Sequence, residues 1–457
     1  MLLDFPLRPG RGRYEVTVGT TRLAHPSTEP VGATTPVVPA HPWWWFLKST
    51  PGKILMLGIV LATAGVLSAV ATSASVQNRQ LALSTVLNHT EPLAYSAGQL
   101  YSTLSVADAA ATTAFIAGTE PQGVRERYEQ AITDASTALV AASSGLTDRP
   151  MQELLSRINA ELSVYTGLVE TARTNNRASN PVGASYLSEA SALMQHTILP
   201  DAQRLYEETS NRVDQETSAS TRVPFPVIVI VLGTMIGGVF GHRWLSKKTR
   251  RMVNPGMLAG GAALLLMVVW VGIALAVSAS LGTDARNGGA HSLKTITQLV
   301  ISAQQARADE TLALIRRGDE SVRKKSYYDR IDEMEHKIGE YLTNPDAIAR
   351  ADLERAQQLL GRWRQADDRI NAYIGVGNYQ AATQVALGSS ESDSTPAFDS
   401  LDAALRNGVQ DSRRQLRSGV LNAERALTLS SAGALILSVS GAICVGVGLW
   451  PRLSEYR

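Results

Sequence analysis

The sequence is poor in the residues and motifs that carry chemistry. It has one cysteine, Cys444, so neither an internal disulfide framework nor a cysteine-based metal site can form within one chain. It lacks a glycine-rich phosphate loop and the HExxH and CxxC patterns, and its seven histidines are scattered without a paired metal spacing. A formal net charge of +2 gives no indication of nucleic-acid binding. We therefore expect no enzymatic activity, no cofactor, no metal and no nucleic-acid partner.

Charged residues are also missing from four long apolar blocks. Since a bilayer core of ~30 Å needs about 20 mostly apolar residues in a helix, each block predicts a transmembrane helix. The predicted spans are 54–76, 223–241, 257–281 and 429–450. The first block lies too far from the N-terminus for a signal peptide, which favours an uncleaved anchor.

Basic residues mark one side of the predicted membrane. Lysine and arginine are concentrated in the N-terminal tail (1–53), the loop between spans two and three (242–256) and the C-terminal tail (451–457), and tryptophans lie at the same edges. Short cytoplasmic segments carry an excess of Lys and Arg, so both termini of this plasma-membrane protein are predicted to be cytoplasmic. The tail of 1–53, rich in Pro, Thr and Gly, is expected to be disordered. The loop holds a basic cluster that either sets this topology or contacts acidic lipids or an acidic partner, formed by Lys247, Lys248, Arg250 and Arg251.

The two long polar segments, 77–222 and 282–428, show helical periodicity. Apolar residues recur at alternating spacings of four and three, as at Met151, Leu155 and Ile158. Such heptads place apolar side chains along one seam of a helix, as antiparallel bundles require. Prolines, glycines and Asp/Asn turns divide each segment into about four helices. The predicted fold class is an all-α membrane protein with four transmembrane helices and two tandem extracytoplasmic four-helix bundles.

The two polar segments also resemble each other. Ala107-Asp108 followed by Phe115-Ile116 is echoed by Ala308-Asp309 followed by Leu314-Ile315, at an offset of roughly 200 residues. This similarity indicates a tandem repeat whose unit is span, outer bundle, span.

Two local patterns remain open to more than one interpretation. Asn88-His89-Thr90 fits a glycosylation sequon, but we favour a helix break with Thr90 as N-cap before Glu91-Pro92. Glycine pairs in the spans, at Gly237-Gly238 and Gly260-Gly261, predict close helix packing. That packing would lie either within one protomer or in a homodimer.

Three classes of function fit a protein of this kind: a signal relay, an envelope scaffold, and a transporter or its accessory. Transport is disfavoured because the spans contain no ionisable residue. In a relay, the outer bundles would meet a solute-binding protein or an amino acid. If an acidic ligand binds directly, arginines near bundle turns suit it, because a guanidinium forks onto a carboxylate. These candidate contacts are Arg125, Arg127, Arg173 and Arg177.

Each outer segment resembles the four-helix-bundle sensor domain of bacterial chemoreceptors and sensor kinases, notably in the Ala-Asp stretch before Phe115-Ile116 and Gly118. The arrangement of four spans, two bundles, a proline-rich tail and the short end 449–457 is similar to the actinobacterial GlnX family. That resemblance implies a relay between a surface solute-binding lipoprotein, GlnH, which binds aspartate, glutamate or related amino acids, and the cytoplasmic serine/threonine protein kinase G. It also implies that ligand binding and phosphoryl transfer belong to these partners. In contrast to chemoreceptors and sensor kinases, no cytoplasmic signalling helices or kinase domain follow in this sequence.

Overall fold

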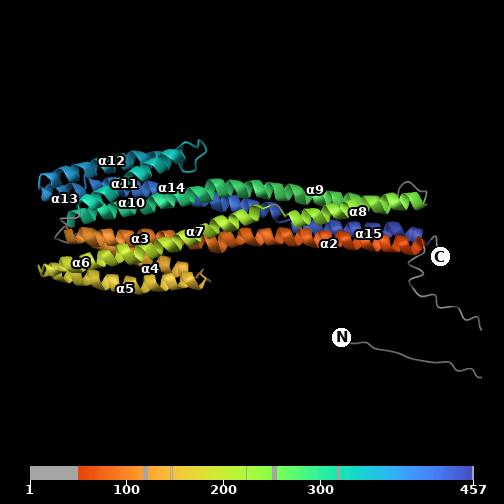
Figure 1. Cartoon of the computed structure of the whole chain (residues 1–457), viewed down its shortest axis with the longest axis horizontal. Coiled ribbons are helices and arrows are strands. Elements are labelled where there is room, and N and C mark those ends of the chain that lie inside the picture. The colour runs from red at the N-terminus through yellow and green to blue at the C-terminus, as the bar shows by residue number, and fades with distance from the viewer. Residues whose placement is uncertain are drawn as a thin grey trace, which may run out of the picture.

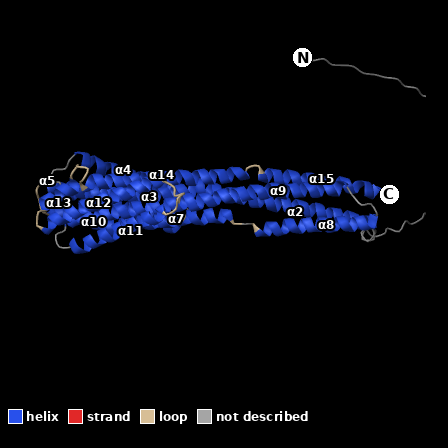
Figure 2. Ribbon diagram, turned by 90° about the horizontal axis from the view of Figure 1, so that it is seen from above, coloured by secondary structure: helices blue, strands red, loops and turns tan. Residues whose placement is uncertain are grey.

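The protein is an elongated assembly of helices that lie nearly parallel to its long axis (Figure 1). The computed structural model describes residues 50–116, 122–144, 146, 148–222, 224–249, 255–315 and 320–454. Within these ranges all regular secondary structure is helical (Figure 2). Among the described residues, four helices are long and apolar enough to cross a membrane. The predicted fold class, an all-α membrane protein with four spans and two tandem bundles, is therefore confirmed.

The four spans occupy one half of the molecule and the two bundles occupy the other (Figure 1). The spans are α2 (Thr50–Thr85), α8 (Phe225–Thr249), α9 (Pro255–Asp284) and α15 (Ser430–Ser454). The start of α2, the end of α8, the start of α9 and the end of α15 lie at the same end of the molecule (Figure 1). A helix satisfies its own backbone polar groups, which is why apolar segments cross a bilayer in this form.

The first bundle follows α2 directly. It consists of the π-helical segment η1 (Val86–Thr90), α3 (Glu91–Ile116), α4 (Gln122–Ser144), α5 (Arg149–Arg177), α6 (Val182–Leu193), the π-helical segment η2 (Met194–Ile198) and α7 (Leu199–Thr221). Because α6, η2 and α7 join end to end, the bundle has four rods. The heptad seam of α5 is buried at its centre, where Ile158 and Tyr165 pack against the other rods.

The second bundle follows α9 in the same way. It consists of the π-helical segment η3 (Ala285–Ala290), α10 (His291–Ile315), α11 (Glu320–Leu342), α12 (Arg350–Gly375), α13 (Tyr379–Leu387) and α14 (Ser394–Leu427). Trp363 of α12 is fully buried, with the rings of Tyr327 and Phe398 edge-on at centroid distances of 5.4 and 5.1 Å. Edge-to-face aromatic contacts of this kind add to the stabilisation that burial alone provides.

The short helix α13 is absent from the sequence-based prediction. α12 ends before Gly377, which adopts a positive φ of 74° that a side chain would oppose. The Asn378 side chain then accepts a hydrogen bond from the Ala381 amide and begins α13. The Gly-Asn pair was the available signal for this break.

The predicted helix break at Thr90 is wrong. α2, η1 and α3 form one helix from Thr50 to Ile116, and the Thr90 hydroxyl donates to Glu216 of α7 instead of capping a helix. Pro92 has no amide hydrogen and would ordinarily kink or end an α-helix. The π-helical turn just before it changes the local hydrogen-bond register, so the helix continues. The π-helical segment η2 likewise precedes Pro200.

Several predicted features lie outside the described residues. These are the tail over 1–49, the turns at 117–121 and 316–319, part of the basic loop at 250–254, and the end at 455–457. The other predicted turns are observed, since α5 begins after Asp148 and α12 follows a turn at 343–349.

η3 and α14 approach each other closely at Gly289. A Cβ atom on Gly289 would lie 2.6 Å from the Cα of Leu416, closer than packed atoms allow. We predict that Gly289→Ala lowers the free energy of unfolding by about 2 kcal/mol, because overpacking costs about 1–3 kcal/mol. Thermal unfolding of the full chain in detergent, followed by circular dichroism, measures this change.

Gly339 of α11 is the matched control, because a Cβ there would meet no atom within 4 Å. Gly339→Ala should be neutral or stabilising by up to ~1 kcal/mol, since alanine favours the helix. Equal effects of the two substitutions would contradict the proposed close contact.

Candidate signalling interface between the bundles

The two bundles are joined by the helices that rise from the membrane. α3 of the first bundle packs against α10 of the second, and each also packs against the last helix of its own bundle, α7 or α14. Figure 1 shows α3 and α10 side by side where the two bundles meet. Because α3 and α10 continue into the spans α2 and α9, a displacement at this contact is connected directly to the membrane helices.

Polar side chains bridge the two bundles along this contact. The hydrogen bonds, with the donor named first, are Gln305–Tyr101 (2.8 Å), Arg406–Ser102 (2.7 Å), Gln410–Tyr95 (2.7 Å), Lys294–Asn211 (3.0 Å) and Arg127–Asp399 (2.9 Å). Tyr101 and Ser102 are buried. A shift in the register of α3 against its neighbours would leave such buried groups without partners, which costs free energy. The bonds therefore favour one arrangement of the bundles.

Glu91 lies in the first turn of α3 and is 1% exposed. Its carboxylate accepts hydrogen bonds from Arg413 and, at 2.6 Å, from Arg417, both on α14 of the second bundle. Arg417 also donates to the carbonyl oxygen of Leu87 in η1, and the Arg413 guanidinium lies 3.8 Å from the centroid of the Tyr95 ring. A buried carboxylate is tolerated only when its charge is compensated. The cluster therefore ties α14 to the point where the first bundle leaves the membrane.

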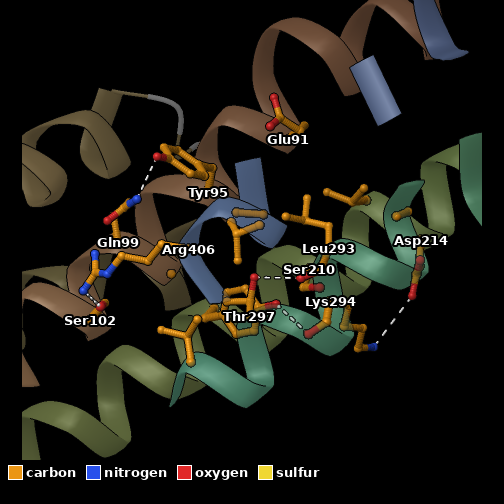
Figure 3. A pocket seen from close by; sticks show the side chains of 17 residues that line it. Glu91, Tyr95, Gln99, Ser102, Ser210, Asp214, Leu293, Lys294, Thr297 and Arg406 are labelled. Atoms are coloured by element: carbon orange, nitrogen blue, oxygen red, sulfur yellow. Dashed lines mark hydrogen bonds and ion pairs between the residues drawn. The ribbon is translucent and has the colours of Figure 1, made fainter. Parts of the chain in front are cut away.

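A small cavity lies beside this cluster (Figure 3). It has a volume of about 50 Å³ and is lined by side chains of α3, α7, α10 and α14. Lys294 forms an ion pair with Asp214 at 3.7 Å on one side, and Arg406 bonds Ser102 on another. The cavity has room for a few water molecules but is far below the size of an ordinary ligand site. We therefore interpret this region as a packing interface between bundles.

Asp108 of α3 lies inside the first bundle and is 3% exposed. Its carboxylate accepts hydrogen bonds from Gln195 (2.9 Å), Ser191 (3.1 Å) and Tyr165 (3.4 Å). Burial raises the pKa of Asp108 from 3.8 to about 6, and the hydrogen bonds oppose this shift only in part. The first rod of this bundle thus carries a buried group that titrates not far below neutral pH.

The second bundle also encloses a buried polar cluster. Glu310 of α10 accepts hydrogen bonds from Ser394 (2.5 Å), Trp363 (3.2 Å) and Arg307. Asp367 is 5% exposed, and burial followed by repulsion from Glu310 raises its pKa to about 7. The two clusters are alike. In the first bundle an acidic residue of α3 accepts hydrogen bonds from an aromatic residue of α5 and a serine of α6. In the second bundle an acidic residue of α10 accepts them from an aromatic residue of α12 and a serine of α14.

The structure brings together two of the four arginines predicted as ligand contacts. Arg173 and Arg177 of α5 both line a cavity of about 50 Å³ between α3, α5 and α6. Arg173 is buried, bonds Glu170 at 2.6 Å, and lies 4.8 Å from the centroid of the Tyr128 ring. A contact between these arginines and a ligand stays a prediction.

The other two arginines are on α4 and do not line that cavity. Arg125 forms an exposed ion pair with Glu129 at 2.7 Å. Arg127 instead reaches Asp399 of the second bundle and so belongs to the interface.

The predicted basic cluster begins at the end of α8. Lys247 is exposed there and Lys248 lies in the last turn of the helix, whereas Arg250 and Arg251 lie outside the described residues. Contact of this cluster with acidic lipids or a partner stays a prediction.

Sequence reasoning missed Glu91 as a functional residue. The sequence pattern predicted only that Glu91 begins a helix. Its bonding partners, Arg413 and Arg417, are 322 and 326 residues further along the chain. A local pattern contains no information about such a distant pair. The proposed tandem repeat would have suggested only that the two bundles are alike, not that α14 contacts α3.

Comparison with known proteins finds one similarity, and it lies in the first bundle. Residues 82–218 match the family model of the actinobacterial sensor domain. No curated protein and no solved structure matches the chain. The match, which covers less than half of the chain, indicates a sensor domain with a role in sensing or signalling, and the four apolar helices of the described residues indicate a multi-pass membrane protein. They do not single out the GlnX family.

The raised pKa of Asp108 predicts a pH dependence of stability. The folded state holds the proton up to about pH 6 and the unfolded state only up to about pH 4, so the folded state binds more protons in this window. The contribution of Asp108 to the free energy of unfolding is therefore greatest below about pH 4. It falls by about 3 kcal/mol as the pH rises past 6. Asp108→Asn should remove this component of the pH dependence, as measured by denaturant unfolding of the full chain from pH 4 to 7.

Asp134 is the matched control for Asp108, because it lies on the exposed face of α4. Asp134→Asn should keep the wild-type slope of stability against pH. If Asp108→Asn also kept that slope, the buried carboxylate would not be its source.

Removal of the Glu91 charge should loosen the interface. In Glu91→Gln, Arg413 and Arg417 lose their shared carboxylate, and we expect a cost of about 2 kcal/mol, below the 3–5 kcal/mol of a fully buried pair because both arginines are partly exposed. Hydrogen–deuterium exchange of the full chain should show faster exchange in η1, the first turns of α3 and the facing part of α14.

Glu153→Gln is the control, since Glu153 pairs with Arg149 on the surface and such pairs contribute little. This substitution should leave exchange in α3 and α14 unchanged. Unchanged exchange in Glu91→Gln as well would show that the carboxylate does not hold the bundles together.

Proposed function

We propose that this protein is a transmembrane signal relay that couples amino-acid sensing outside the cell to a serine/threonine protein kinase inside it. The sensor-domain match over residues 82–218 supports the sensing role. The resemblance to the GlnX family supports the amino-acid signal, a solute-binding lipoprotein as its carrier and a cytoplasmic kinase as the recipient. In this proposal the chain itself performs no chemistry.

The observation that carries this proposal is the continuity of two helices between membrane and bundle. One helix runs through residues 50–116 and another through 255–315, and each passes from a span into the core of a bundle. The returning helices are interrupted instead, with extended backbone at Arg222 before α8 and a turn at 428–429 before α15. Helix shifts of about 1–2 Å are a known means of switching, and an unbroken helix transmits them along its axis.

A protein partner suits the two regions singled out above better than a small ligand does. The space between the bundles and the space beside Arg173 each measure about 50 Å³, whereas small-molecule sites occupy about 300–1,000 Å³. A larger polar cavity of about 410 Å³ lies elsewhere, between η3, α10, α11 and the turn at 343–349 of the second bundle. A lipoprotein that binds the amino acid in its own cleft could dock on the bundles and displace α3 against α10. This arrangement needs no ligand pocket inside either bundle.

We further propose that the chain is a tandem repeat with both termini in the cytoplasm. The π-helical segments η1 and η3 support the repeat, because they lie at equivalent points between span and bundle and roughly 200 residues apart. The Lys and Arg residues at the membrane end shared by α2, α8, α9 and α15 support the orientation.

The relay predicts specific partners and a ligand effect. Affinity purification of the intact protein from crosslinked native membranes, with and without added aspartate and glutamate, should recover a solute-binding lipoprotein and a kinase. The amount of at least one partner should change with the amino acid, because the signal shifts the arrangement of the bundles. Mass spectrometry identifies and quantifies what is recovered.

Glu91→Gln provides an internal test of the route. It should retain the partners but weaken the amino-acid effect, whereas Glu153→Gln should behave as the wild type. Recovery of envelope-assembly proteins alone, without ligand dependence, would replace the relay by a scaffold.

A further inference from the structure

A groove lies between the spans α8 and α9, towards the end of α8 and the start of α9. It has a volume of about 590 Å³ and is bounded by α2, α8, α9 and α15. α8 packs chiefly on α2 and touches α9 little, which leaves the space between them. A hydrogen bond of 2.7 Å between Ser68 and Thr234 joins α2 to α8 towards one end of the groove, and a cluster of Ile54, Leu245 and Met257 lies at the other.

The glycines around this groove are of two kinds. A Cβ atom on Gly260 would lie 2.5 Å from Val445, so this glycine permits close packing of α9 on α15. A Cβ atom on Gly65, Gly238 or Gly261 would meet nothing within 4 Å, although all three residues line the groove. Packing within the chain therefore does not account for these three glycines, and they leave the groove wide.

The mouth of the groove differs in chemistry from its walls. His242 and Arg243 of α8 line its end next to the connecting loop, and Lys247 is exposed one turn further along α8. The remaining lining is apolar or consists of glycine and small residues. Hydrocarbon walls with a cationic mouth are complementary to an anionic amphiphile.

We propose that this groove binds one acyl chain of an anionic phospholipid, with the headgroup phosphate held by Arg243 and His242. The lining of α8 extends from Thr234 to Arg243, a rise of about 14 Å along the helix, close to one half of a bilayer core of ~30 Å. A guanidinium is well suited to a phosphate because it can form two parallel hydrogen bonds. This site does not depend on the proposed relay and would exist equally in a scaffold.

The chemistry of the lining favours an anionic lipid over a helix from a second copy, because His242 and Arg243 lie at one end of an otherwise apolar groove. An acyl chain is thinner than a helix and can lie along the spans that bound the groove. The cationic mouth also has no use in contact with another apolar helix.

Native mass spectrometry of the purified full chain tests this proposal. After incubation with vesicles of phosphatidylglycerol or of phosphatidylcholine with the same acyl chains, the protein should retain one phosphatidylglycerol in preference to phosphatidylcholine. Arg243→Ala should reduce this preference about five-fold, since each basic residue near an anionic surface contributes about that factor. Equal retention of the two lipids by the wild type would overturn headgroup recognition.

Groove-filling variants test the position of the site. Gly238→Leu and Gly261→Leu should abolish retention of the lipid, because their side chains would occupy the groove. Gly237→Leu and Gly272→Leu are matched controls, since these glycines also face open space but do not line the groove. Unchanged lipid retention in Gly238→Leu and Gly261→Leu would overturn the site. A wild-type dimer that these two variants lose and the control variants keep would also overturn it, because a second copy would then occupy the groove.

Discussion

The need of the backbone for hydrogen bonds in hydrocarbon constrains the rest of this structure. An unpaired amide or carbonyl inside a bilayer costs several kcal/mol, so each span is a helix. In α2 and α9 the helix does not end at the membrane surface but continues through a π-helical turn into a bundle. The positions of α3 and α10 are therefore set by the spans from which they rise. In the membrane α15 packs on both α2 and α9, whereas outside it α3 and α10 meet directly.

Buried polar groups then help to decide how the two bundles fit together. Apolar packing of α3 on α10 already favours particular registers, because the side chains of the two helices interdigitate. The ion pairs of Arg413 and Arg417 with Glu91 strengthen this preference, since a shift of α3 against α14 would leave the buried Glu91 carboxylate without its partners. Such an interface has a few discrete arrangements instead of a continuum, which is the property that a two-state relay requires.

Much of the architecture could be predicted from the pattern of residue types. Apolar blocks without charges predict spans because the bilayer imposes their length and polarity, and heptads such as Met151, Leu155 and Ile158 predict bundles because a helix buries one face. The predicted break at Thr90 was wrong because the rule for proline assumes an α-helical register, which the π-helical turn before Pro92 changes. The separate helix α13 was missed because its cause, the backbone of Gly377, occupies a single residue.

The sequence by itself determined the number of spans, the helical class and the absence of common catalytic motifs, because these follow from composition and short-range periodicity. Only the tertiary structure decided which residues meet: Glu91 with α14, Arg127 with Asp399, and Arg243 with the groove between the spans. Residues hundreds of positions apart come together through the packing of whole helices. A local pattern cannot specify such contacts, because it records the face of a helix that is buried but not the helix that covers it.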